Sequence, residues 1–461
     1  MFRKLIGDRA FYRRVIAVAL PIIIQNGIAN FVSLLDNIMV GQLGNNPMSG
    51  VSIVNQLLFV FNLCIFGATS GAGIFTAQFH GSQDHSGIRH TFRFKVLAGL
   101  LITLLGVGLF LLADTALINL YLTGEGDATD ARQILLYGKD YLHIMLWGLP
   151  AFALSNAYAG TLRESGQTRI PMLSSVSAML TNMVLNWVLI FGHFGLPAMG
   201  VEGAAIATVI SRYVELAVVV IWTHRHPDAM PFIRGAFRGF SIPKELFARI
   251  IRKGMPLLVN EALWSIGMAT INQCYSTRGL DVVPAQQISS TMYNLSGVVY
   301  LALGNAVGIL IGQMLGAGET EEKVRDADRK LIFASVVSCI LFGALMAAIS
   351  PFFPLLYQST DSVRLLATRL ICISALFLPF HGYTHATYFT LRSGGQTLVT
   401  FLFDSCFVWV FCVPLAYVLS RFTSLPILPL FFLCSCTDLI KTAIGAYMIK
   451  QGKWIQNLTA K

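Results

Sequence analysis

The chain has 461 residues, of which 55% are hydrophobic and only 12% are charged. Soluble domains carry roughly 25% charged residues, so too few charges remain here to cover a water-facing surface. The composition excludes a soluble globular domain, and the formal net charge of +10 has to be interpreted against a membrane.

Apolar stretches of about 20 residues, the length that crosses a bilayer, follow one another along the whole chain. The first one continues past about 20 residues and lacks a small-residue cleavage pattern, so it is a span and not a cleaved signal peptide. We expect an all-α membrane protein with twelve transmembrane helices. The predicted spans are residues 14–42, 51–79, 94–113, 135–161, 171–193, 200–222, 248–275, 284–313, 331–350, 366–390, 398–419 and 427–449.

Two segments half a chain apart share six of eight residues: TLRESGQT at 161–168 and TLRSGGQT at 390–397. Further matches pair Gln78 with Gln313 and Gly81 with Gly316. Recurrence at a fixed offset is typical of an internal duplication. Because each copy holds an even number of spans, we expect two pseudo-twofold-related six-helix bundles, related by an axis along the membrane normal, around a central pathway.

The duplication predicts three parts: an N-terminal bundle, residues 1–223, a connector, residues 224–247, and a C-terminal bundle, residues 248–461. In the connector, basic residues alternate with Phe and Ile. This pattern suits an amphipathic element at the cytoplasmic lipid surface. A plain linker between the repeats is an equal alternative.

Lys and Arg cluster at the N-terminus, around residues 89–95, in the connector and in the C-terminal tail. Cytoplasmic loops carry such an excess, so we expect a multi-pass protein of the cytoplasmic membrane with both termini in the cytoplasm. The net positive charge is then a topology signal and does not indicate nucleic-acid binding. All eight cysteines lie in apolar segments, which favours free buried thiols. We expect a monomer that uses no cofactor.

An acidic residue stands out in the first span. Insertion of Asp at the centre of a transmembrane helix costs about 2.5–3.5 kcal/mol, so such a residue needs a reason. Asp36 lies beside a helical stripe of Asn26, Asn30, Ser33 and Asn37, spaced 4, 3 and 4 residues apart. We favour a direct role of Asp36 in transport over a structural hydrogen-bonding carboxylate.

The span 171–193 places Ser175, Asn182 and Asn186 on one helical face. Two amides one turn apart offer carbonyl oxygens to a hard cation. Hydrogen bonding between helices is an equal alternative for such Asn residues. Thr208, in the next span, can add a hydroxyl oxygen.

In the second half, Glu261 begins a stripe that runs to Asn272. Asp404 follows closely after the GQT turn, so a structural role at the membrane interface is favoured. Asp438 and Lys441 are three residues apart, and an ion pair between them is the simplest explanation for both.

His381, His385 and Tyr388 share a face of the span 366–390. A histidine pair at i, i+4 can bind a metal, but no third ligand is identifiable, so aromatic lining of a pocket is favoured. Pro21 and Pro256 occupy matched positions of the two copies and are expected to bend their helices.

Taken together, these features resemble the MATE family of multidrug and toxic-compound extrusion transporters. Within that family, the sequence is most similar to the DinF-like prokaryotic branch. The resemblance covers almost the whole chain. It is carried by the Leu20–Pro21 pair, the acid in LLDNIMVGQLG, the turn at 78–81, and the R-x-x-G-x-T turns after the fourth and tenth spans. It implies efflux of drug-like, cationic or amphipathic compounds in exchange for H⁺ or Na⁺ by alternating access.

The resemblance further implies a coupling-ion site at Asp36, Asn182, Asn186 and Thr208, with Na⁺ as one candidate ion at Asp36. Family members often have Asp where this chain has Asn186, so the site keeps one carboxylate and its choice between H⁺ and Na⁺ stays open. The family's second-lobe acids correspond only loosely to Glu261. The other candidates for the substrate or the second lobe are Asn272, His381, His385, Tyr388 and Asp404.

A lipid or polysaccharide flippase of the same superfamily is the nearest alternative, and it would be expected to carry more basic residues in its cavity. A membrane-embedded receptor or enzyme is a more distant one. No HExxH, GxSxG or Gly-rich phosphate-binding motif is present to support an enzyme.

Overall fold

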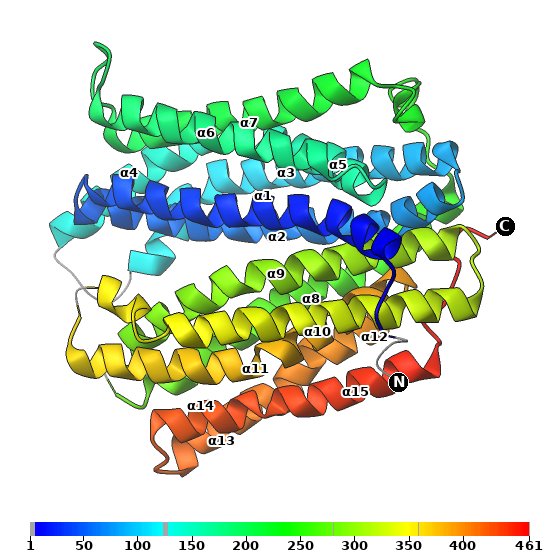
Figure 1. Ribbon diagram of the computed structural model, residues 1–461. Helices are drawn as coiled ribbons and strands as arrows, with labels where there is room; N and C mark the ends of the chain where they lie inside the picture. Colours follow the sequence, from blue (N-terminus) through cyan, green and yellow to red (C-terminus); the bar gives the residue numbers. More distant parts are fainter. Residues whose placement is uncertain (1–4, 123–127, 280, 358, 461) are drawn as a thin grey trace. The chain divides into compact units, whose positions relative to one another are not determined.

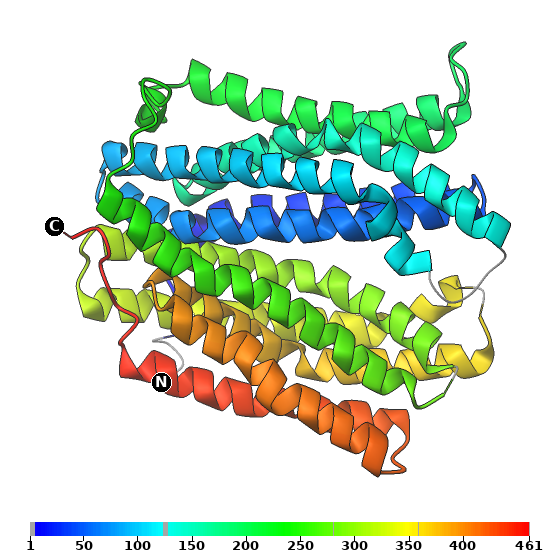
Figure 2. The same ribbon diagram turned by 180° about the vertical axis from the view of Figure 1, so that it is seen from behind.

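The computed structural model describes residues 5–122, 128–279, 281–357 and 359–460, without the side chains of Ser33, Leu34, Asn37 and Ala128. Two members of the polar stripe predicted beside Asp36, Ser33 and Asn37, therefore have side chains outside the described residues. Over the described ranges the regular structure is helical (Figures 1 and 2).

The described residues of the first half form seven α-helices. They are α1 (Arg9–Gly41), α2 (Asn45–Gly81), α3 (His85–Leu122), α4 (Ala128–Leu146), α5 (Leu149–Glu164), α6 (Arg169–Phe191) and α7 (Gly200–Arg225). In the second half, the part that the structure describes contains four long α-helices and four shorter ones. They are α8 (Lys244–Ser276), α9 (Val282–Gly316), α10 (Glu321–Ile349), α11 (Asp361–Ser393), α12 (Thr397–Phe401), α13 (Val413–Phe422), α14 (Ile427–Ser435) and α15 (Thr437–Gln451).

Every predicted span coincides with one of these helices or with consecutive ones, and the span 398–419 also includes the π-helical turns η4 (Leu402–Cys406) and η5 (Val408–Cys412) between α12 and α13. Ten stretches of the described chain are long and apolar enough to cross a membrane. The other two predicted spans correspond to α4 with α5, which are separated at Trp147, and to α8, whose first half is rich in Lys, Arg and Glu. The predicted all-α membrane fold is therefore confirmed.

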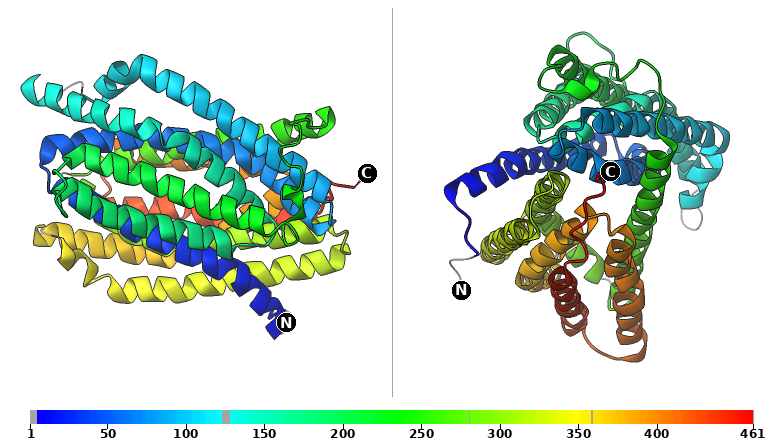
Figure 3. Two further views of the ribbon diagram at one scale, coloured as in Figure 1. Left: turned by 90° about the horizontal axis from the view of Figure 1, so that it is seen from above. Right: turned by 90° about the vertical axis from the view of Figure 1, so that its right-hand side faces the viewer.

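The described residues form two compact units. Unit 1 comprises those between positions 1 and 23, 77 and 83, and 252 and 461, and unit 2 comprises those between 24 and 76 and between 84 and 251. The core of unit 1 packs α9 against α10 and α11, and these helices are seen nearly end-on in Figure 3, on the right. The core of unit 2 joins α2, α4, α5 and α7. The division at residues 1–223, 224–247 and 248–461 stays a prediction.

Within unit 1, the ends of α2 and α9 cross at the repeated glycines. A Cβ atom on Gly81 would collide with the carbonyl oxygen of Gln313, and one on Gly316 would collide with that of Gln78. The side chain of Gln78 is buried and donates from Nε2 to the carbonyl oxygen of Ser393 at 2.9 Å. The glutamine and glycine that recur in both copies thus have a packing role.

The connector between α7 and α8 is a packed, turn-rich segment around the 3₁₀ turn η2 (Pro231–Ile233). Its residues Phe232 and Ala236 are each 1% exposed. Arg93 of α3 donates to the carbonyl oxygens of Ala236 (2.7 Å) and Gly235 (2.8 Å). Buried apolar side chains and an arginine therefore attach this segment to its own unit, and a place on the cytoplasmic lipid surface stays a prediction.

Pro21 lies inside α1 and Pro256 inside α8. Proline removes a helical hydrogen bond, so both positions suit bending, which stays a prediction.

Candidate functional site

The four residues predicted for the coupling-ion site come together in unit 2. Asp36 lies on α1, Asn182 and Asn186 lie one turn apart on α6, and Thr208 lies on α7. Asn186 Nδ2 donates to Asp36 Oδ1 at 2.7 Å and lies 3.2 Å from Asn182 Oδ1. Asn182 Nδ2 lies 3.2 Å from Thr208 Oγ1, which in turn donates to the carbonyl oxygen of Ala204 at 3.0 Å. Three helices therefore direct one carboxylate, two amides and a hydroxyl to one place.

The amide of Asn182 has two possible orientations. When Asp36 is ionised and binds neither a proton nor a metal cation, neither orientation gives every polar group of the site a hydrogen-bond partner. With its oxygen towards Asp36, that oxygen faces both carboxylate oxygens at 3.0 Å. With its nitrogen towards Asp36, it donates to both oxygens but meets the amide nitrogen of Asn186 at 3.2 Å. One positive charge resolves the first arrangement: a proton on Asp36 that is donated to Asn182 Oδ1, or a hard cation held by these oxygens.

Tyr141 of α4 and Arg212 of α7 belong to the polar surroundings of this site. Tyr141 is 5% exposed, its Oη lies 3.4 Å from Asn55 Oδ1, and it interacts electrostatically with both Asp36 and Arg212. The guanidinium of Arg212 lies over the ring of Phe152, 5.1 Å from its centroid. Its Nη1 is buried and has no hydrogen-bond partner in the described part of the chain.

A further acid, Glu215, lies two turns beyond Thr208 on α7. Ser175 Oγ donates to Glu215 Oε1 at 2.6 Å and accepts from Gln25 Nε2 at 2.7 Å. Ser175 is predicted on one face with the Asn residues of α6, whereas Glu215 and Arg212 are not among the residues predicted for the site. Both are charged residues within a predicted span, so the cost argument applied to the acid of the first span would have found them.

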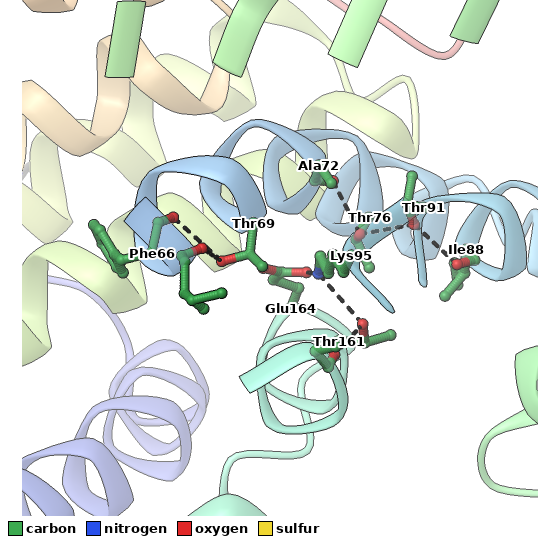
Figure 4. Close-up of polar contacts among 11 residues, drawn as sticks. Phe66, Thr69, Ala72, Thr76, Ile88, Thr91, Lys95, Thr161 and Glu164 are labelled. Carbon is green, nitrogen blue, oxygen red and sulfur yellow. Dashed lines mark hydrogen bonds and ion pairs between the residues drawn. The ribbon is translucent and has the colours of Figure 1, made fainter. Parts of the chain in front are cut away.

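A second charged cluster of unit 2 joins α3 to α5 (Figure 4). Lys95 Nζ forms an ion pair with Glu164 and lies 3.3 Å from Thr161 Oγ1. The Lys95 side chain is fully buried, whereas that of Glu164 is 20% exposed. Gly73 of α2 leaves room for this pair, because a Cβ atom there would collide with the Glu164 carboxylate. Glu164 belongs to the repeated TLR segment, in which the second copy has Ser393.

In unit 1, Asp404 lies in the π-helical turn η4 (Leu402–Cys406). Lys441 Nζ donates to its Oδ1 at 2.7 Å, and Asn260 Nδ2 donates to its Oδ2 at 3.0 Å. The expected ion pair between Asp438 and Lys441 is therefore wrong. Asp438 Oδ2 lies instead 3.3 Å from His381 Nε2. Spacing along one helix cannot show that a neighbouring helix offers each side chain a better placed partner.

The two predicted histidines of α11 lie among tyrosines. The ring of His385 lies 4.5 Å from that of Tyr300, and the ring of His381 lies 5.4 Å from that of Tyr293. Among the described residues no group of three metal-binding side chains occurs. The aromatic-lining interpretation fits this geometry, and a role of His381 and His385 in substrate binding stays a prediction.

Glu261 and Asn272, both on α8, do not share a site. Glu261 interacts electrostatically with Arg392, Asp404 and Tyr388. Asn272 Oδ1 accepts a hydrogen bond from Gln286 Nε2 at 3.0 Å. At 1.5 Å per residue, Asn272 lies about 16 Å along the helix from Glu261. Glu261 and Tyr388 can therefore act with Asp404, while Asn272 belongs to another part of unit 1.

Comparison with known proteins identifies the chain's relatives. The family model described as MatE matches residues 21–188 and 256–418. The Probable multidrug resistance protein NorM of Thermotoga maritima is 24% identical over 447 residues, covering 96% of this chain and 93% of that protein. The Probable multidrug resistance protein YoeA of Bacillus subtilis is 25% identical over 413 residues, covering 88% and 87%. Neither name specifies the DinF-like branch, which stays a prediction.

Solved structures show the same fold at full length. An outward-facing multidrug resistance MATE family transporter of the MOP superfamily superposes with a TM-score of 0.84 at 20% identity, covering 98% of both chains. A MOP superfamily transporter from Pyrococcus furiosus, described with a binding pocket of reversed polarity that suggests a different function, superposes with a TM-score of 0.81 at 20% identity and the same coverage. The family model matches both halves of the chain and covers well over half of the chain's residues. The chain therefore belongs to the MATE family of multi-pass membrane transporters, which are not enzymes.

Proposed function

We propose that the protein is a multidrug efflux antiporter, which exports drug-like cationic or amphipathic compounds in exchange for H⁺ or Na⁺ by alternating access. Both relatives are named as multidrug resistance proteins. The observation that carries the coupling part of the proposal is the Asp36 site, where amide and hydroxyl groups of two other helices surround one carboxylate.

The stoichiometry follows from charge. The site holds one carboxylate, so one monovalent cation neutralises it and a second would have no counter-charge. The contacts favour the proton: with Asp36 protonated, donors and acceptors alternate from Asn186 through Asp36, Asn182 and Thr208 to the carbonyl oxygen of Ala204. Na⁺ stays the alternative, because the same oxygens suit a hard cation.

Alternating access links the ion to the drug through a two-state equilibrium. An ion shifts that equilibrium only by its difference in affinity for the two states. When the coupling ion binds to Asp36, the chain of contacts described above joins α1 to α6 and α7. When the ion leaves, neither orientation of the Asn182 amide gives every group of the site a hydrogen-bond partner. Matching solved structures are described in bent and straight conformations, which fits a fold with two states.

The test uses purified protein in liposomes, with proton and sodium gradients imposed separately and ethidium transport followed by fluorescence. We expect transport against the ethidium gradient when the proton gradient alone is present. Transport driven only by sodium would assign the site to Na⁺. Transport that ignores both gradients would refute antiport.

A flippase is the second candidate, because Arg212 is a partly buried cation whose Nη1 is buried and has no hydrogen-bond partner in the described part of the chain. Such a group can receive an anionic headgroup. Fluorescent anionic lipid placed in the same liposomes distinguishes the two functions: a flippase moves the lipid between leaflets, and a drug antiporter does not.

A further inference from the structure

Unit 1 contains a cavity of about 350 Å³ that the antiport mechanism does not use. It lies among α10, α11, α15 and the segment that follows α15. Its polar lining includes Asp328, Arg329, Tyr383 and Lys450, and its apolar lining includes Phe333 and Trp454.

Asp328 forms the buried part of this cavity. Its side chain is completely buried, and its Oδ1 accepts from Thr390 Oγ1 at 2.5 Å. Its Oδ2 is buried and has no hydrogen-bond partner in the part of the chain that the structure describes. A buried carboxylate with an unpaired oxygen is unfavourable unless a donor or a positive charge reaches it. The cavity is where such a group can enter.

The repeat shows what is missing at Asp328. Thr161 and Thr390 are equivalent positions of the two TLR segments. In the first copy the threonine contacts Lys95, whose charge is balanced by Glu164. In the second copy the threonine contacts an acid that has no ion pair among the described residues, and the exposed Arg329 beside it in the chain acts on it only electrostatically. A direct partner for Asp328 Oδ2 is therefore expected from a ligand.

The rim of the cavity has the opposite charge. Arg329 and Lys450 are exposed, and neither side chain forms an ion pair within the described ranges. Arg325, which also lines the cavity, is already paired with Glu321. An acid inside and two cations at the rim fit a ligand with an inner amine and an outer phosphate. Apolar side chains, Phe333 among them, suit acyl chains beside that headgroup.

We propose that this cavity binds the headgroup of phosphatidylethanolamine, with its ammonium on Asp328 and its phosphate against Arg329 and Lys450. The Lys and Arg residues at this end of unit 1 place the site at the cytoplasmic leaflet, in the orientation expected from the sequence. Phosphatidylcholine has no N–H to donate to Asp328, and phosphatidylglycerol has no ammonium. The site therefore selects for the primary amine.

The test measures lipids that stay bound to the purified full-length protein. The protein is exchanged into phosphatidylcholine nanodiscs that contain equal minor fractions of phosphatidylethanolamine and phosphatidylglycerol, and retained lipid is identified by mass spectrometry. We expect selective retention of phosphatidylethanolamine. Asp328→Asn lowers this retention by at least about tenfold, the change expected for loss of one charge-assisted hydrogen bond.

Asp326→Asn is the matched control, since Asp326 lies on the same helix with its side chain 52% exposed and pairs with Lys330 at the surface. Its retention of phosphatidylethanolamine should equal that of the parent protein. If Asp328→Asn does not fold, Arg329→Gln gives a second reading: it should weaken retention, while Lys323→Gln, at another exposed cation of α10, should not.

Equal retention of phosphatidylglycerol, unaffected by Asp328→Asn, would overturn the proposal and leave only a basic rim for anionic lipid. Equal retention of phosphatidylcholine would overturn it as non-selective binding. Displacement of retained lipid by tetraphenylphosphonium that requires Asp328 but not Arg329 would instead make the cavity a drug site. None of these measurements involves transport, so a failure of the lipid-site proposal can be distinguished from a failure of the antiport proposal.

Discussion

At the scale of single residues, the chemistry converges on Asp36. Asp36→Asn keeps the size of the side chain and its ability to hydrogen-bond but removes the charge that holds the coupling ion. We expect ethidium export to fall to background in cells with unchanged amounts of membrane-inserted protein. Asp326→Asn, at an exposed surface acid, should leave export unchanged. Normal export by Asp36→Asn at normal protein levels would refute the assignment.

Asn186 decides how much negative charge the site holds. Asn186→Asp places a second carboxylate at the 2.7 Å contact with Asp36 Oδ1. Two adjacent carboxylates repel each other and are stabilised by a bound metal cation, so transport should become more dependent on sodium. The measurement compares ethidium transport by variant and parent across sodium concentrations at fixed pH. Identical sodium responses would show that Asn186 lies outside the ion site.

At the scale of helices, small residues decide which buried charges can pair. Gly73→Ala puts a methyl group where the Glu164 carboxylate lies and so disturbs the contact of α2 with the Lys95–Glu164 pair. We expect a loss of about 1–3 kcal/mol in stability, the range for overpacking of a packed interior. A thermal unfolding midpoint in detergent measures it.

Gly108→Ala on α3 is the control for that measurement, because nothing lies within 4 Å of the Cβ position there. Its midpoint should not fall. If both alanine variants unfold at the same temperature as the parent, the Glu164 side chain moves aside without cost and the helix contact does not depend on Gly73.

At the scale of the whole molecule, the duplication predicts that equivalent loops of the two halves lie on the same side of the membrane. Ser82 and Ala317 are exposed, repeat-related positions after α2 and α9. Single cysteines there, in a chain without its eight native cysteines, should both be shielded from an impermeant thiol reagent added outside intact cells. Cysteines at the exposed positions Ala198 and Ser424 should both react.

Labelling of only one cysteine within either pair would contradict the parallel orientation of the repeats. Reversal of both pairs would keep the repeat relation and overturn the cytoplasmic placement of the termini. The predicted monomer is a separate question, which the mass of the purified protein in detergent answers.

The sequence by itself determined the membrane class and the positions of the long apolar helices, and it predicts twelve spans in a two-copy plan. These depend on the apolar length of each span and on repeated residues, and both are local properties of the chain. The site residues of unit 2 came from a family resemblance, supported by the cost of placing an acid in the first span.

Only the tertiary structure decided which charges are partners. Helical spacing shows only neighbours within one helix, so it predicted an ion pair of Asp438 with Lys441. In the packed structure Lys441 pairs with Asp404, and Asp438 pairs with His381. In the same way, Asp328 looks like a surface acid in EEKVRDADRK, and only packing against α11 buries it completely. A charge in a packed interior is governed by what neighbouring helices bring to it, and sequence distance does not encode that.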